Sequence, residues 1–161
     1  MNHRIEQINE PEIKQKIAIE VIATLPEWFG NAEANNKYVE ELKQYAFFSV
    51  FRETNEVIGF ASLKIHHSKT ADIFIVGIKP EFQRQRIGKE LFLVCEKYCK
   101  LNKCTRIVVK TLSELSQYEP YLRTVRFYKK LGFEELITFD EFWDINNKCL
   151  LLIKDIKNHN F

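Results

Sequence analysis

Hydrophobic residues recur along this chain with two different periods, which predict its helices and strands. A spacing of three to four residues, typical of helices, runs through Pro11–Leu25, Ala32–Gln44, Ile87–Leu101 and Tyr121–Leu131. Alternating or continuous apolar runs, typical of strands, are Ala46–Arg52, Val57–His66, Ala71–Lys79, Arg106–Thr111, Phe133–Phe139 and Cys149–Ile153, with a short first strand possible at Ile5–Ile8. This order predicts an α/β sandwich, in which helices cover both faces of a mixed, mostly antiparallel sheet of six to seven strands.

Composition narrows the class of protein. The 161 residues are 45% hydrophobic and 29% charged, as expected for one globular domain that spans residues 1–161. Lys and Arg number 24 against 22 Asp and Glu, so the chain lacks the basic excess of a duplex nucleic-acid binder. No apolar run approaches the ~20 residues that span a bilayer, and the first residues lack a signal sequence. We therefore expect a cytoplasmic protein without a membrane partner.

The cysteines and histidines do not form a metal-binding pattern. Cys95 and Cys99 lie four residues apart on a predicted helix, but no second pair of matching spacing accompanies them. His66 and His67 end a strand and point to opposite faces, where solvent exposure is the simpler expectation. We expect no bound metal, and we expect all four cysteines to be buried and reduced.

A polar, basic segment at residues 80–92 follows a strand and opens directly into a helix. Backbone N–H groups at the start of a helix, together with the positive end of its dipole, bind phosphates well. Arg84, Arg86 and Lys89 add positive charge to this loop. The segment therefore predicts a phosphate site, although many nucleotide-binding proteins share this arrangement.

Two motifs make the assignment more specific. Residues 83–88, Gln-Arg-Gln-Arg-Ile-Gly, resemble the Gln/Arg-x-x-Gly-x-Gly/Ala signature of the GNAT superfamily of acyl-CoA-dependent N-acyltransferases. Residues 127–133, Phe-Tyr-Lys-Lys-Leu-Gly-Phe, resemble a later segment of the same family. The chain departs from the family pattern at Arg86, where most members have glycine.

The resemblance implies a cofactor and a way of binding it. Acetyl-CoA would be the acyl donor and would lie in a splay between strands four and five. Its pantetheine arm would pair with the edge of strand four at Val76, Gly77 and Ile78. Its phosphates would lie on the loop that consists of Gln83, Arg84, Gln85, Arg86, Ile87, Gly88 and Lys89. Gly77 permits a close approach of another backbone, or else marks a bulge.

Two residues are candidates for proton transfer. An acceptor amine must lose a proton before it attacks, and the departing thiolate must gain one. The resemblance assigns the second task to Tyr128, which on helical spacing alone is equally a core residue. Asp72, an acidic residue in an apolar strand, matches in register a glutamate that serves as base in some family members. The alternative for Asp72 is that it merely begins the strand in solvent.

The acceptor is the least determined feature. Trp28, Phe29 and Tyr121 are candidates to line its pocket, and core packing is the alternative for each. Three functions remain open: an N-acetyltransferase that acts on a primary amine of a small molecule or peptide, a catalytically inactive acyl-CoA-binding regulatory module, and a nucleic-acid binder without cofactor. A homodimer is possible, since the sequence does not determine the oligomeric state.

Overall fold

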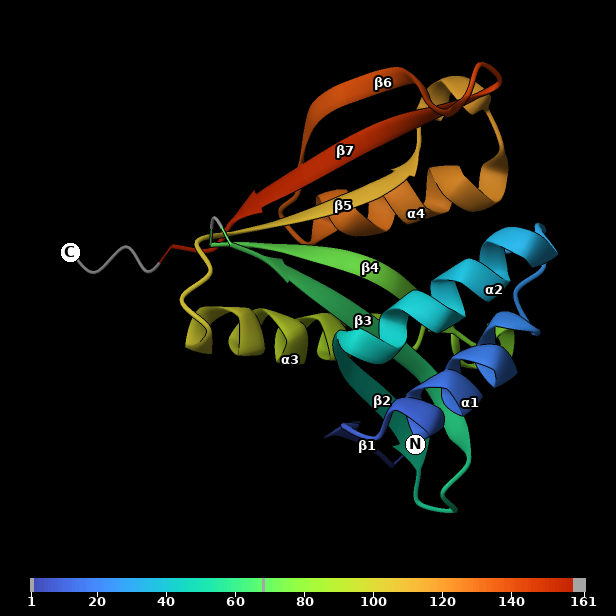
Figure 1. The fold of residues 1–161 in the computed structure, drawn as a ribbon, viewed down its shortest axis with the longest axis vertical. Helices are drawn as coiled ribbons and strands as arrows, with labels where there is room; N and C mark the ends of the chain where they lie inside the picture. Colours follow the sequence, from blue (N-terminus) through green and yellow to red (C-terminus); the bar gives the residue numbers. More distant parts are fainter. Residues whose placement is uncertain (1, 68, 158–161) are drawn as a thin grey trace. The chain divides into compact units, whose positions relative to one another are not determined.

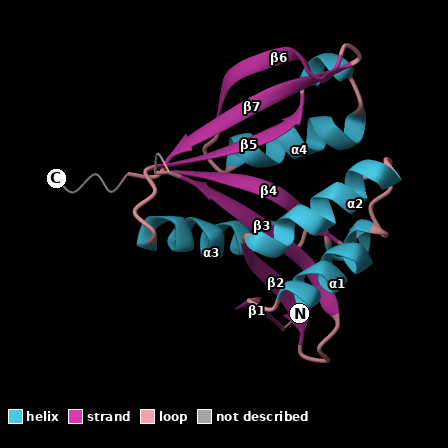
Figure 2. Ribbon diagram, in the orientation of Figure 1, coloured by secondary structure: helices cyan, strands magenta, loops and turns pink. Residues whose placement is uncertain are grey.

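The computed structural model describes residues 2–67 and 69–157, and these residues form seven strands and four α-helices (Figures 1 and 2). In chain order the elements are β1 (His3–Gln7), α1 (Pro11–Ile22), α2 (Ala32–Glu41), β2 (Ala46–Arg52), β3 (Val57–His66), β4 (Thr70–Ile78), α3 (Ile87–Leu101), β5 (Arg106–Leu112), α4 (Glu119–Lys130), β6 (Glu134–Asp144) and β7 (Asn147–Asp155). The strand order in the sheet is β1-β2-β3-β4-β5-β7-β6. The predicted fold class is confirmed, and the splay between strands four and five stays a prediction.

The chain divides into two compact units. The first unit comprises Met1–Lys64 with Ile73–Tyr98, and the second comprises Ile65–Asp72 with Cys99–Phe161. None of the described helices is long and apolar enough to cross a membrane. Each unit has its own core and is described separately below.

Helices cover both faces of the strands in the first unit. Phe47 and Phe48 are neighbours on β2 and point to opposite faces. Phe47 is fully buried in a cluster with residues of α1, whereas the ring of Phe48 lies 5.3 Å from that of Tyr98 on α3. Because successive residues of one strand contact α1 and α3, these two helices lie on opposite faces of β2.

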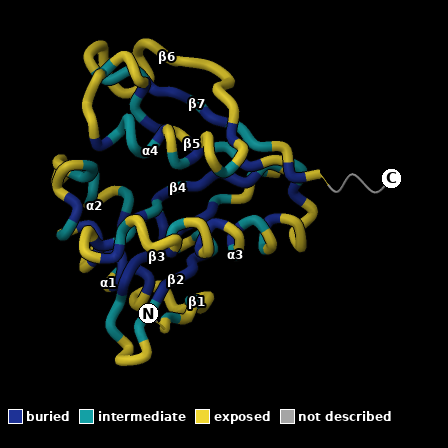
Figure 3. Tube along the Cα trace, turned by 180° about the vertical axis from the view of Figure 1, so that it is seen from behind, coloured by how far each residue is buried: buried dark blue, intermediate teal, exposed yellow. Residues whose placement is uncertain are grey.

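In the second unit, β7 pairs antiparallel with both β5 and β6. Val125 and Tyr128 of α4 are buried, as are Ile107 and Val109 of β5. In contrast, every residue of β6 is exposed, and this strand ends the sheet (Figure 3). A sheet edge with apolar residues thus remains uncovered within the described part of this unit.

Most predicted boundaries agree with the structure to within two residues, and the exceptions are the ends of α1, α2 and β6. Helix α1 was predicted to continue to Leu25 but ends at Ile22, because the chain turns before Pro26. Helix α2 was predicted to continue to Gln44 but ends at Glu41, because the chain tightens into a 3-10 turn over Leu42–Gln44. Strand β6 was predicted to end at Phe139 but continues to Asp144. There the carboxylate accepts hydrogen bonds from the backbone N–H groups of Asn146 and Asn147, which closes the hairpin into β7.

Candidate functional site

The loop between β4 and α3 belongs to the first unit, and two glutamine side chains determine its path. Nε2 of Gln83 donates to the Ile78 carbonyl over 2.9 Å, and Nε2 of Gln85 donates to the Glu81 carbonyl over 3.0 Å. Both amides therefore hold the loop against the backbone that precedes it. Each amide keeps a second N–H and its carbonyl oxygen, so the contact of Gln83 and Gln85 with the cofactor stays a prediction.

Two arginines of the loop have left-handed backbone conformations. The φ angle is 59° at Arg84 and 66° at Arg86, a region that costs an L-residue roughly 1–2 kcal/mol. Arg86 stands where the family motif has glycine, so the chain keeps the glycine conformation and adds a charged side chain. The same conformation occurs outside the loop at Asn55, Lys69, Lys103 and Gln117, so it supports a functional site only together with the charges of the loop.

The cations of this loop are not neutralised by the protein. Arg84, Arg86 and Lys89 are exposed, and among the described residues none of them has an ion-pair partner. Ile87, which begins α3, is 1% exposed and anchors the helix start in the core. The first N–H groups of a helix have no acceptor within it. Three free positive charges beside such N–H groups fit the phosphates of a coenzyme A molecule.

The predicted pantetheine segment lies on β4 directly before this loop. Gly77 is closely packed, because an added Cβ would lie 2.9 Å from Leu25 Cδ1, beyond the end of α1, and 3.2 Å from Val21 Cγ1 of α1. The atoms that approach Gly77 are side-chain atoms of the same unit and not another backbone, so its pairing with the pantetheine arm stays a prediction. The Ile78 carbonyl is already an acceptor for Gln83, whereas Val76 is half-buried.

Asp72 is buried in the second unit rather than exposed at the start of its strand. Its side chain is 7% exposed, and Oδ2 accepts a hydrogen bond from Lys110 Nζ over 2.7 Å. His66 Nε2 lies 3.4 Å from the same oxygen. The alternative that Asp72 begins the strand in solvent is therefore wrong. The carboxylate has a cationic partner that the sequence did not reveal, because Lys110 is 38 residues away along the chain.

All four cysteines are free thiols and are buried, as expected. Burial raises the pKa of the Cys149 thiol to about 11, with a smaller increase from the Asp72 charge and an opposing effect of Lys110. Burial also raises the pKa of Cys104. Neither thiol is therefore a reactive thiolate near neutral pH. The described residues contain no group of three or more His, Cys, Asp or Glu side chains that could hold a metal ion.

Tyr128 lies on α4 in the second unit and is 2% exposed. Its ring centroid lies 5.3 Å from that of Phe133, with the planes at 70°, and 5.3 Å from that of Phe127. Helix α4 ends as the motif requires, since Gly132 has a φ of 96° and the Phe133 N–H donates to the Tyr128 carbonyl. The ring is thus a core element of its unit, and its role in proton transfer stays a prediction.

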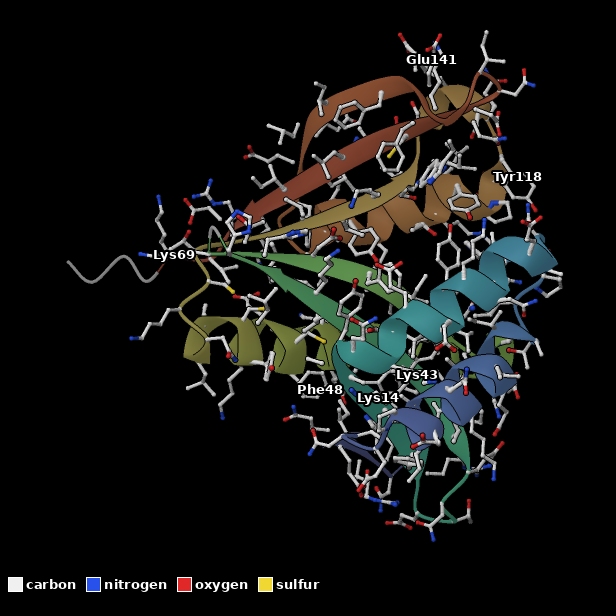
Figure 4. The ribbon with its side chains drawn as sticks, viewed as in Figure 1. Lys14, Lys43, Phe48, Lys69, Tyr118 and Glu141 are labelled. Carbon is white, nitrogen blue, oxygen red and sulfur yellow. The ribbon has the colours of Figure 1, made fainter. Side chains whose placement is uncertain are left out.

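The three candidate acceptor residues belong to different units. Trp28 and Phe29 are partly buried and pack against the core cluster of the first unit. Tyr121, on α4 in the second unit, is half-buried, and its ring centroid lies 5.9 Å from that of the exposed Tyr118 (Figure 4). Packing accounts for Trp28 and Phe29 within their unit, and their part in an acceptor pocket stays a prediction.

Sequence reasoning missed two features of these sites. The ion pair of Asp72 with Lys110 carries no local signal, because it joins two strands. The left-handed conformation of Arg84 was equally hidden, since its residue type favours the right-handed region. That of Arg86 was signalled by the glycine that the family motif has at this place.

Similarity to known proteins identifies the family of this chain. The model of the acetyltransferase (GNAT) family matches residues 15–133 of the chain. Among curated proteins, none matches it.

Solved structures with the same fold are similar to this chain over most of its length. A protein from Desulfovibrio desulfuricans that is described as an acetyltransferase of the GNAT family superposes with a TM-score of 0.83 at 15% identity, covering 97% of this chain and 100% of that one. PaiA N-acetyltransferase from Thermoplasma acidophilum, in complex with coenzyme A, gives 0.73 at 20% identity, with coverages of 96% and 99%. A protein from Bacillus anthracis that is described as a streptothricin acetyltransferase, in complex with acetyl coenzyme A, gives 0.61 at 17% identity, with coverages of 69% and 62%.

Proposed function

Since the chain belongs to the acetyltransferase (GNAT) family, we propose that it moves an acetyl group from acetyl-CoA directly to a primary amine of a small molecule or peptide. It is an acetyl-CoA-dependent acyltransferase, and acetyl-CoA is its donor. The identity of the amine acceptor and the direct route of transfer are parts of the proposal.

One observation carries the proposal: the strained, unneutralised loop at the start of α3. Arg84 and Arg86 keep left-handed backbones, and with Lys89 they present three cations without ion-pair partners among the described residues. A protein gains no folding stability from this arrangement. It gains affinity for a polyanion, because charge-assisted hydrogen bonds to phosphate are worth about 1.5–3 kcal/mol each.

Direct transfer is supported by the state of the cysteines. A covalent route through cysteine would need an accessible thiolate to accept the acetyl group, and all four thiols are buried. In the direct route, Asp72 accepts a proton from the ammonium group, and the neutral amine then attacks the thioester carbonyl and forms a tetrahedral intermediate. The C–S bond breaks, and coenzyme A leaves as a thiolate. Tyr128 donates a proton to the sulfur and regains one from the nitrogen.

The assignment of Asp72 as base carries a cost in energy. A proton on Asp72 would leave the Lys110 ammonium, 2.7 Å away, without its carboxylate partner. The base role therefore requires that Lys110, whose side chain is 34% exposed, be solvated at that moment. Backbone N–H groups near Ile78 are the proposed stabilisers of the oxyanion.

Two measurements test the function. Acetyl-CoA should raise the melting temperature saturably, because a native-state ligand at 100 times its Kd adds about 2.7 kcal/mol of stability. Protection by duplex DNA or RNA, with none by acetyl-CoA, would favour the nucleic-acid alternative. Thiol release from acetyl-CoA in the presence of a panel of amines and peptides should then identify an acceptor. Protection without thiol release for any member of the panel would favour the inactive regulatory module.

The location and assembly of the protein also remain predictions. We expect a cytoplasmic enzyme, and a homodimer is possible. Sedimentation velocity with and without acetyl-CoA measures the second point, because a dimer and a monomer of 19.2 kDa chains differ clearly in sedimentation coefficient.

A further inference from the structure

A cluster of aromatic rings and one carboxylate lies in the first unit, between α2 and the strands β3 and β4. The ring centroid of Phe74 lies 5.9 Å from that of Tyr38 and 5.1 Å from that of Tyr45, and both pairs are edge-to-face. The hydroxyl of Tyr45 donates to Glu41 Oε1 over 2.5 Å. All three rings are half-buried, so part of each remains accessible.

This aromatic cluster already holds a cation from the chain itself. Lys64 Nζ lies 5.4 Å from the centroid of the Tyr45 ring and 3.9 Å from Glu41 Oε1. An ammonium over an aromatic face, with a carboxylate beside it, is the arrangement that proteins use to bind cationic amines. The Lys64 side chain is 39% exposed and sits on a flexible stem, so another cation can replace its ammonium group.

The position of the cluster relates it to the donor. Phe74 lies on β4, two residues before Val76, where the segment assigned to the pantetheine arm begins. A ligand that contacts Phe74 would therefore adjoin the segment of β4 to which the acyl donor is assigned. Tyr38 and Glu41 come from α2, and Tyr45 follows this helix closely.

The chemistry of the cluster limits what it can hold. The nitrogen that attacks the thioester must be neutral, whereas aromatic faces and a carboxylate favour the protonated form. The cluster is therefore unsuited to the reacting nitrogen at the moment of attack. It suits a second ammonium group on the same acceptor molecule.

We infer that Tyr38, Glu41, Tyr45 and Phe74 form a binding site for an ammonium group of a di- or polyamine acceptor, and that the Lys64 ammonium occupies this site until such a ligand displaces it. This inference rests on the proposed function, since it names the class of acceptor. The Lys64 ammonium then competes with the ammonium group of the ligand for this site, which a residue that only packs would not do.

Direct binding tests the inference without turnover. The probes are 1,5-diaminopentane and the neutral 1,5-pentanediol, titrated calorimetrically at pH 7 into the protein alone and into the protein saturated with coenzyme A. We expect the diamine to bind roughly three- to thirtyfold more tightly than the diol, the range that a cation–π site supplies. Equal affinities for the two probes would overturn the inference.

Variants separate ligand binding from folding. Lys64→Met should tighten diamine binding, because it removes the competing ammonium from a partly exposed position. Glu41→Gln and Tyr45→Leu should weaken diamine binding roughly three- to thirtyfold. Glu33→Gln, on the same helix but ion-paired with Lys37, is the charge control and should leave the affinity unchanged. Unchanged or weaker diamine binding by a folded Lys64→Met protein would overturn the inference, even if Tyr45→Leu fails to fold.

The two proposals fail in different experiments. If acetyl-CoA does not protect the wild-type protein in a melt, the proposed function fails, whatever the diamine titration of the protein alone gives. If acetyl-CoA protects the protein but diamine binding does not depend on Glu41 or Lys64, the inference alone fails.

Discussion

The candidate functional residues differ in burial and pairing between the loop at the start of α3 and the core around Asp72 and Tyr128. In the loop, charged side chains are exposed, lack ion-pair partners among the described residues and stand on strained backbone. In the second unit, Asp72 and Tyr128 are 5% and 2% exposed, and Asp72 is paired with Lys110. The loop cations are therefore available to bind a ligand, whereas the buried candidates already contribute to the fold.

This difference determines which substitutions are informative in each region. A single exposed cation such as Lys103 is an ordinary solvated surface charge, whereas three cations gathered at one helix start fit a polyanionic ligand. A buried and paired carboxylate has a structural role that explains its presence without catalysis. Substitutions that separate stability from activity are thus informative for the buried region, and substitutions that separate affinity from stability are informative for the loop.

The largest expected effect is that of Tyr128→Phe, which tests whether the buried region is more than a core. Phenylalanine keeps the ring contacts with Phe133 but removes the hydroxyl. We expect turnover with saturating acceptor to fall roughly 10²–10⁴-fold, the usual contribution of a positioned acid, while acetyl-CoA affinity stays the same. Phe133→Leu is the packing control and should lower stability without lowering kcat. Wild-type turnover by Tyr128→Phe would reduce this residue to a core side chain.

Arg86→Gly tests the loop side of the comparison. If the side chain contacts a phosphate, acetyl-CoA affinity should fall roughly ten- to a hundredfold and its salt dependence should decrease. The melting temperature without ligand should not fall, because glycine adopts a φ of 66° without strain. The variant would thus lose acetyl-CoA affinity without losing stability.

Lys103→Gly is the matched control for the loop variant. Lys103 has a φ of 61° and is exposed at the end of α3, away from the start of the helix. Its replacement should relieve similar backbone strain and leave acetyl-CoA affinity unchanged. Equal affinities of wild type and Arg86→Gly, or equal salt slopes, would mean that Arg86 does not contact the donor.

Asp72→Asn distinguishes the two roles of a buried carboxylate. We expect the free energy of unfolding to fall by about 1–3 kcal/mol, less than for a fully buried pair because Lys110 is partly exposed. If Asp72 is also the base, the acidic limb of the pH–rate profile should shift, or activity on amines of high pKa should disappear. Lys110→Met should cost similar stability but keep activity on amines of high pKa, because it leaves the Asp72 carboxylate in place. An unaltered profile in a folded Asp72→Asn protein would leave the residue with a structural role only.

The smallest effect at neutral pH is that of Cys149, and it appears only in alkaline solution. Burial raises the pKa of its thiol to about 11, above the ordinary value of 9.0. The folded state therefore keeps a proton that the unfolded state loses, and the resulting stability is present below pH 9 and lost as the pH rises to about 11. We expect this loss to be about 2–3 kcal/mol. Chemical denaturation at pH 8 and pH 11 should show a smaller difference for Cys149→Ala than for wild type.

The sequence predicts more of the fold than of the site, and particular elements show why. The bounds of β2, β3 and α3 agree with prediction because each has a clear hydrophobic period between polar segments. The pairing of Asp72 with Lys110 and the close packing of α1 on Gly77 depend on residues far apart in the chain. Local patterns do not contain such contacts, so a motif could name Asp72 but could not give its surroundings.

Strand β6, whose eleven residues are all exposed at the end of the sheet, has a consequence for how copies of the chain meet in solution. The backbone N–H and C=O groups of an open sheet edge with aromatic residues can pair with a strand of another chain. Five carboxylates and no basic residue lie on this strand, and the side chain of one of them, Glu141, points outward (Figure 4). Glu135 and Asp140 are ion-paired with Lys129 and Lys148, so the remaining carboxylates make two such edges repel each other and act against aggregation. Replacement of Glu134 and Glu141 by glutamine removes part of this repulsion, and light scattering of the variant at neutral pH should rise above that of the wild type.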